Sequence, residues 1–171
     1  MIIRSLLKAT PLLIVLFCAS AFTYTNEYKV TRVYDGDTIA VVENGKRIRV
    51  HLVGIDSPET SKGKNKPGQP FNQKSIKYLS WLILNETIEI KSYGVDRYGR
   101  ILGVVYNEGE NINLEMVKEG YAEVYRGKSP DGFDLSQYKS AEMEAREAKK
   151  GIWIQGENFI SPFVWRRMNK K

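Results

Sequence analysis

Residues 38–52 read TIAVVENGKRIRVHL, and this stretch predicts the β-hairpin around which we build the rest of the fold. Residues 38–43 are typical of a strand, and Asn44-Gly45 is typical of a two-residue hairpin turn because both positions accept positive φ. In the returning strand, residues 47–55, apolar residues alternate with arginines and a histidine. One face of this strand should therefore enter a core, and the other should face water or a ligand.

The remaining chain supplies further strands and helices. Strands are predicted over residues 28–34, 38–43, 47–55, 87–92 and 100–106. Helices are predicted over 70–84, from a cap at Asn113 to just before Gly120, and from Asp134 to Gly151, followed by an irregular tail with a basic end. This order predicts an α+β fold that is mainly β: a five-stranded Greek-key barrel of the OB type with three helices. An open α+β sheet is the alternative.

The first 21 residues are typical of a secretory signal peptide, with basic Arg4 and Lys8, an apolar run and an Ala19-Ser20-Ala21 cleavage pattern. The mature domain would span residues 22–171, with a core over about 27–154 and a basic tail over 155–171. We therefore expect a secreted or periplasmic protein without stable membrane association. An uncleaved leader would instead act as a membrane anchor, although its apolar stretch is short for a span, and lipoprotein cleavage before Cys18 is a further alternative.

The composition sets wide bounds on the partner. Cys18 is the single cysteine, so the mature chain would contain no disulfide. The formal charge is +6, and removing the two basic residues Arg4 and Lys8 leaves +4. This modest excess suits a polyanion but does not identify one, since an ordinary soluble basic protein has the same balance. Nothing in the sequence demands more than a monomer.

Three short motifs carry the candidate chemistry. Asp35-Gly36-Asp37-Thr38 is followed by Asp56-Ser57-Pro58-Glu59-Thr60, and later by Asp96-Arg97-Tyr98-Gly99-Arg100. Carboxylates are preferred ligands of hard divalent cations, and a guanidinium holds phosphate oxygens in a fixed fork. Together the motifs indicate an enzyme that attacks a phosphodiester. The first motif alone is equally typical of an ordinary turn, because Asp and Gly favour turns.

These motifs, in this order and spacing, resemble those of the thermonuclease (staphylococcal-nuclease-like) family. Weaker matches lie at Gly120-Tyr121-Ala122, at residues 148–153 and in the tail at residues 161–167. The resemblance covers nearly all of the mature chain. It implies an OB-fold nuclease that uses Ca²⁺, hydrolyses DNA and RNA with low sequence specificity, prefers single strands and leaves 3′-phosphate ends.

The resemblance also implies roles for individual residues. Asp37 and Asp56 would bind calcium through their carboxylates, with the backbone carbonyl of Ser57 as a third ligand. Glu59 would position or deprotonate the attacking water, and Arg100 would stabilise negative charge on the phosphoryl oxygens. Weaker candidates for nucleic-acid contact are Arg49, Tyr98, Tyr125 and Arg126.

One position departs from the family pattern. His51, the only histidine of the chain, stands where the family usually has an arginine. It could donate a hydrogen bond to phosphate as a weaker substitute, with partial help from Arg49, and we then count it among the catalytic residues. Alternatively, one phosphate clamp is lost, and the chain is a non-catalytic nucleic-acid-binding OB module.

Overall fold

The computed structural model describes residues 27–61, 63 and 67–169. The expected signal peptide, residues 1–21, lies outside this part of the chain. Within the described residues, no helix has the length and apolar character needed to cross a membrane.

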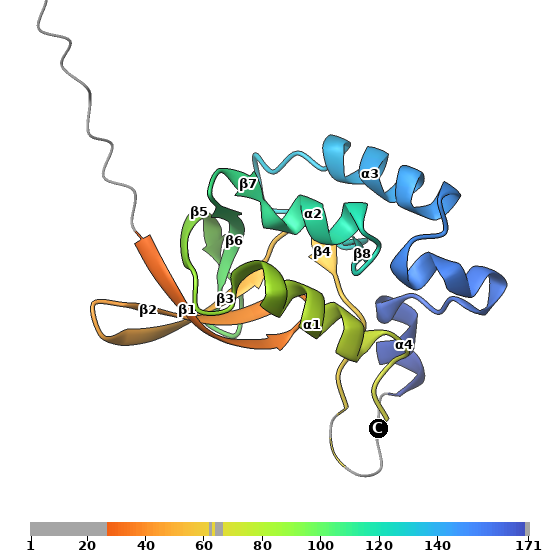
Figure 1. Ribbon diagram of the computed structural model, residues 1–171, viewed down its shortest axis with the longest axis horizontal. Coiled ribbons are helices and arrows are strands. Elements are labelled where there is room, and N and C mark those ends of the chain that lie inside the picture. Colours follow the sequence, from red (N-terminus) through yellow and green to blue (C-terminus); the bar gives the residue numbers. More distant parts are fainter. Residues whose placement is uncertain (1–26, 62, 64–66, 170–171) are drawn as a thin grey trace, which may run out of the picture.

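Five strands close into a barrel (Figure 1). They are β1 (Glu27–Asp35), β2 (Thr38–Glu43), β3 (Lys46–Leu52), β5 (Thr87–Val95) and β6 (Ile101–Asn107). The strands pair antiparallel in the order β3-β2-β1-β5-β6, and a parallel pairing of β3 with β6 closes the barrel. The closed barrel confirms the predicted OB-type α+β fold and excludes the open sheet.

Short strands and helices surround the barrel and continue to the C-terminus. The short strands are β4 (Ile55–Asp56), β7 (Glu110–Asn111) and β8 (Glu123–Val124), of which β4 pairs with β8. The helices are α1 (Asn72–Ile83), α2 (Ile112–Lys118), α3 (Ser136–Glu147), a 3₁₀ segment (Gly151–Asn158) and α4 (Pro162–Met168). Helix α1 packs against β1, and α2 packs against α3 and β6.

The predicted hairpin forms as its sequence indicates. Asn44 and Gly45 adopt positive φ angles of 49° and 76°, and the strands pair on both sides of this turn. On β3, Val50 and Leu52 are completely buried, whereas Arg49 is exposed. The alternation therefore directs the apolar face into the barrel core and leaves the polar face free to line a site.

One cap prediction is wrong. Helix α2 is capped by Asn111, whose side chain accepts a backbone N–H of the first turn, and not by Asn113. Asn113 is fully buried: its Oδ1 accepts the N–H of Val105, and its Nδ2 donates to the carbonyls of Val53 and Gly103. A buried amide that satisfies three backbone groups ties the end of the barrel to α2.

The predictions for the C-terminal third need two corrections. Helix α3 begins at Ser136 rather than Asp134, because the Asp134 carboxylate accepts the N–H and hydroxyl of Ser136 just before the helix. The tail is not irregular: it contains the 3₁₀ segment and α4, so the described residues hold four α-helices rather than three. Trp153 is buried and packs against Phe159, with ring centroids 4.5 Å apart, which fixes the chain before α4.

Candidate active site

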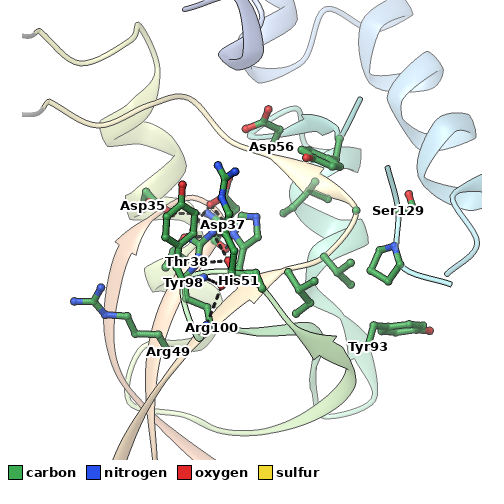
Figure 2. A pocket seen from close by; sticks show the side chains of 18 of the residues that line it. Asp35, Asp37, Thr38, Arg49, His51, Asp56, Tyr93, Tyr98, Arg100 and Ser129 are labelled. Atoms are coloured by element: carbon green, nitrogen blue, oxygen red, sulfur yellow. Dashed lines mark hydrogen bonds and ion pairs between the residues drawn. The ribbon is translucent and has the colours of Figure 1, made fainter. Parts of the chain in front are cut away.

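The three motifs line one open pocket of about 1180 Å³ at an end of the barrel. Figure 2 shows Asp35, Asp37, Thr38, His51, Tyr98 and Arg100 gathered on one side, with Tyr93 and Ser129 across the pocket. Ten residues are predicted from the sequence, and eight of them line this pocket, whereas Ser57 and Arg126 do not. The pocket lining includes Asp37, Arg49, His51, Asp56, Glu59, Tyr98, Arg100 and Tyr125.

The first acidic motif places two carboxylates in contact. The turn after β1 directs the Asp37 N–H to Asp35 Oδ1 at 3.1 Å, and the two carboxyl groups are close enough to affect each other's charge. Burial, followed by the charge of Asp37, raises the pKa of Asp35 to about 8. Burial alone would raise the pKa of Asp37 as well, but hydrogen bonding and the charge of His51 hold it below its usual range. Of these two carboxyl groups, the surroundings favour negative charge on Asp37 over negative charge on Asp35.

The second acidic motif meets the first through Ser57. The Ser57 backbone N–H donates to Asp37 Oδ2 at 2.8 Å, and the Leu52 N–H donates to the Asp37 carbonyl at 2.8 Å. Both Asp37 and Asp56 are buried, at 7% and 5% exposure. The fold thus brings together two acidic segments that are separated by a complete hairpin.

His51 lies beside Asp37. Its Nδ1 is 3.1 Å from the Asp37 carbonyl oxygen and 3.3 Å from Asp37 Oδ1. This contact follows from the register of the hairpin, in which Thr38 on β2 lies opposite His51 on β3. Burial lowers the pKa of His51, but the hydrogen bond and charge of Asp37 outweigh it and raise the pKa above the usual value. His51 therefore contacts and stabilises Asp37 directly, and this role does not depend on any contact with a substrate.

Arg100 points toward the same carboxylate. Its Nε donates to Asp96 Oδ2 at 2.7 Å, and its Nη1 donates to the Thr38 hydroxyl at 3.3 Å. The Thr38 hydroxyl in turn donates to Asp37 Oδ1 at 3.0 Å. Asp96 also accepts the backbone N–H of Arg100, so the turn of the third motif orients its own guanidinium.

Asp56 and Glu59 both contact Arg166, a residue that the sequence motifs did not predict to be part of the site. Arg166, on α4, donates from Nη1 to Asp56 Oδ1 and to Glu59 Oε1, each at 2.8 Å. Its Nη2 donates to Asp56 Oδ2 at 2.7 Å. The only sequence signal was the similarity of the tail to the ends of other family members, which does not indicate where a side chain goes.

The weaker candidates divide into two groups. Tyr98 and Tyr125 line the pocket and are 69% and 37% exposed, so their rings are available for stacking. Arg49 extends away from the cluster around Asp37 and lies over the Tyr34 ring, 4.9 Å from its centroid (Figure 2). Arg126 forms ion pairs with Glu123 and Glu142 instead.

The donor set suits a hard divalent cation. Among residues 27–61, 63 and 67–169, no three His, Cys, Asp or Glu side chains already converge as a metal-binding group. The fit lies in the chemistry: Asp37 and Asp56 offer buried carboxylate oxygens linked through Ser57, and Asp35 crowds Asp37 with a second carboxylate. A divalent cation would favour the ionised form of both carboxylates, and oxygen ligands are those that calcium prefers.

Comparisons with known proteins point in one direction. The sequence model of the family described as "Staphylococcal nuclease homologue" matches residues 49–155, a range that ends before α4. An "Uncharacterized endonuclease" of Haemophilus influenzae is 39% identical over 171 residues, covering 99% of this chain and 89% of the relative. A "Micrococcal nuclease" of Shigella flexneri is 39% identical over 153 residues, covering 83% and 81%. A "Thermonuclease" of Staphylococcus hyicus is 34% identical over 143 residues, covering 80% and 82%.

Proposed function

The chain belongs to the family of staphylococcal nuclease homologues and is a nuclease. We propose that it hydrolyses the phosphodiester bonds of both DNA and RNA and that calcium is its cation. We further propose low sequence specificity, a preference for single strands and 3′-phosphate products. The open pocket suits a polymer that passes through it rather than an enclosed small ligand. The exposed tyrosines at its rim offer stacking surfaces that tolerate any base.

One observation carries this proposal: a continuous hydrogen-bonded chain joins all three motifs. Arg100 donates to Thr38, Thr38 donates to Asp37, and Asp37 accepts the N–H of Ser57. A cation ligand, a guanidinium and the acidic loop are therefore held within one network. Such preorganised charges act where negative charge develops during phosphoryl transfer.

We propose a task for each of these side chains. Asp37 and Asp56, with the Ser57 carbonyl, would hold calcium, which supplies positive charge against a non-bridging phosphate oxygen. Glu59, at the pocket wall, would accept a hydrogen bond from the attacking water and orient it in line with the phosphorus. Arg100 would hold phosphoryl oxygens in its fork as their charge grows. His51 would orient Asp37 and favour its ionised form.

We also propose that the mature protein is exported and monomeric. The support for export is the leader pattern of the sequence, with secretion or release into a periplasm after cleavage at about residue 21. Sequencing the N-terminus of the exported protein by mass spectrometry tests the cleavage. A mature chain that retains the leader would contradict it.

A direct assay separates the nuclease from a binding module. Denatured DNA and RNA are incubated with the mature protein, with calcium or with a chelator, and the product ends are mapped. We expect calcium-dependent fragments with 3′-phosphates, and no fragments from Asp37→Ala. Intact nucleic acid that stays bound in the presence of chelator would instead support the non-catalytic OB module, for which the histidine at position 51 is the motivating feature.

A further inference from the structure

The C-terminal helix carries one side chain into the pocket. Arg166 contacts both oxygens of Asp56 and one oxygen of Glu59, at 2.7 to 2.8 Å. These partners lie 110 and 107 residues earlier in the chain. A single guanidinium thus joins the carboxylate proposed to bind the cation with the carboxylate proposed to position water.

Buried polar groups hold the segment that leads into α4. Gln69, only 2% exposed, donates from Nε2 to the Ile160 carbonyl at 2.6 Å. The Ser161 hydroxyl donates to Glu123 Oε1 at 2.5 Å, and Glu123 is fully buried. Buried polar groups require partners, so docking of this segment satisfies groups that would otherwise lack them. The placement of Arg166 is therefore part of the packed fold.

The side chains of α4 differ in what they contact. Arg166 is half-buried and turned to the pocket, whereas its neighbour Arg167 is exposed and lies over the Phe163 ring, 5.8 Å from its centroid. The two arginines are adjacent on the same short helix and carry the same charge. A comparison between them isolates the contact with the carboxylates from any general effect of the helix.

The contact leaves Asp56 able to bind a cation. An ionised carboxylate has about four lone-pair positions, and Arg166 occupies two of those on Asp56. Burial raises the pKa of Asp56, and the hydrogen bonds of Arg166 oppose that rise. Outer partners of this kind orient a ligating carboxylate without binding the metal themselves.

We propose that Arg166 is a positioning residue of the hydrolytic site: it fixes Glu59 relative to Asp56, which makes helix α4 part of the active site. The inference rests on the proposed nuclease function. Arg166 does not ligate the cation, and its positive charge opposes cation binding. Its removal should therefore lower turnover while leaving cation affinity the same or higher.

The test compares Arg166→Met, Arg166→Lys and the matched control Arg167→Met. For each protein, kcat and KM are measured on denatured DNA at saturating calcium, and calcium affinity is measured separately by titration calorimetry without nucleic acid. Arg166→Met should lower kcat by about 10- to 100-fold, the range seen when such outer partners are lost. KM should change by less than about threefold. Arg166→Lys should fall between Arg166→Met and the wild type, and Arg167→Met should match the wild type.

Three results would overturn the proposal. Turnover of Arg166→Met at or above the wild-type value would mean that α4 only covers the pocket. A rise in KM with unchanged kcat would make Arg166 a substrate-binding residue, and a loss of calcium binding in folded Arg166→Met would make it part of the cation site. If circular dichroism shows that Arg166→Met does not fold, Arg166→Lys decides by the same criteria. An inactive wild type would instead refute the nuclease function itself.

Discussion

The two walls of the pocket are built in different ways. On the barrel wall, hairpin register brings His51 against Asp37, and Arg100 donates a hydrogen bond to the neighbouring Thr38. On the adjoining wall, which we call the tail wall, Asp56 and Glu59 contact Arg166 from the last helix. The first wall joins segments that are already hydrogen-bonded as a sheet, and the second depends on how the C-terminal segment docks.

Because of this difference, we expect the two walls to contribute to catalysis in different ways. Barrel-wall groups lie on paired strands and turns and have several hydrogen-bond partners each, as Asp37 has in Thr38, His51 and Ser57. On the tail wall, one guanidinium contacts both carboxylates, so Arg166 contributes directly to their relative orientation. We therefore expect residues of the barrel wall to contribute most to electrostatic stabilisation of the transition state. Residues of the tail wall should contribute mainly by orienting the catalytic carboxylates.

The largest expected effect is that of Asp37→Asn on the barrel wall. It removes the charge proposed to bind calcium and should lower kcat by about 10³-fold or more, because cation stabilisation of the transition state amounts to several kcal/mol. Calcium titration should show a matching loss of binding. Asp131→Asn is the control, because Asp131 is an exposed carboxylate on the same pocket lining. Full calcium-dependent cleavage by Asp37→Asn would contradict the cation assignment.

The next effect should come from Arg100→Lys. Lysine keeps the charge but loses the fork that donates to Asp96 and Thr38 together. We expect a reduction of about 10²-fold in kcat, measured at saturating substrate. Arg97→Lys is the matched control, because Arg97 belongs to the same turn and lies exposed over the Tyr98 ring. Equal effects of the two changes would show that Arg100 acts only through net charge.

A smaller effect concerns stability and its dependence on pH. Burial disfavours ionised Asp96, but hydrogen bonds from Arg100 and Tyr98 hold its pKa below the usual range. A lowered folded-state pKa adds stability above the unfolded-state pKa of about 4, and this stability is lost as the pH falls through the folded-state value. Asp96→Asn should thus destabilise the fold by about 1 kcal/mol at pH 7 in urea denaturation. The difference from the wild type should shrink below about pH 4, and a constant difference would exclude this linkage.

The smallest change tests the departure at position 51. Arginine stays charged at pH 8, whereas histidine is charged mainly below its pKa, so His51→Arg should raise kcat/KM at pH 8 by about tenfold or less. Arg49→Met provides the comparison, because Arg49 lies over Tyr34 and away from Asp37. A flat or lower rate in His51→Arg would show that this position does not contact phosphate and acts only on Asp37.

Most of the fold could be predicted from local sequence patterns. Alternation on β3 and the Asn44-Gly45 turn predict the hairpin, because strand faces and turn angles depend on neighbouring residues. The two acidic motifs flank that hairpin, so their meeting through Ser57 follows once the hairpin forms. The cap assigned to Asn113 fails because Asn111 is equally suited to capping and only burial distinguishes them.

The sequence motifs could not predict contacts between segments that are distant along the chain. The placement of Arg166 on Asp56 and Glu59 depends on how Gln69 and Glu123 dock the C-terminal segment, and no periodicity of a seven-residue helix encodes this. The chemistry of the site thus follows from residue types within short motifs, where chain connectivity brings the groups together. Its completion by α4 follows from packing, because the free energy of a buried ion pair depends on which surfaces meet in three dimensions.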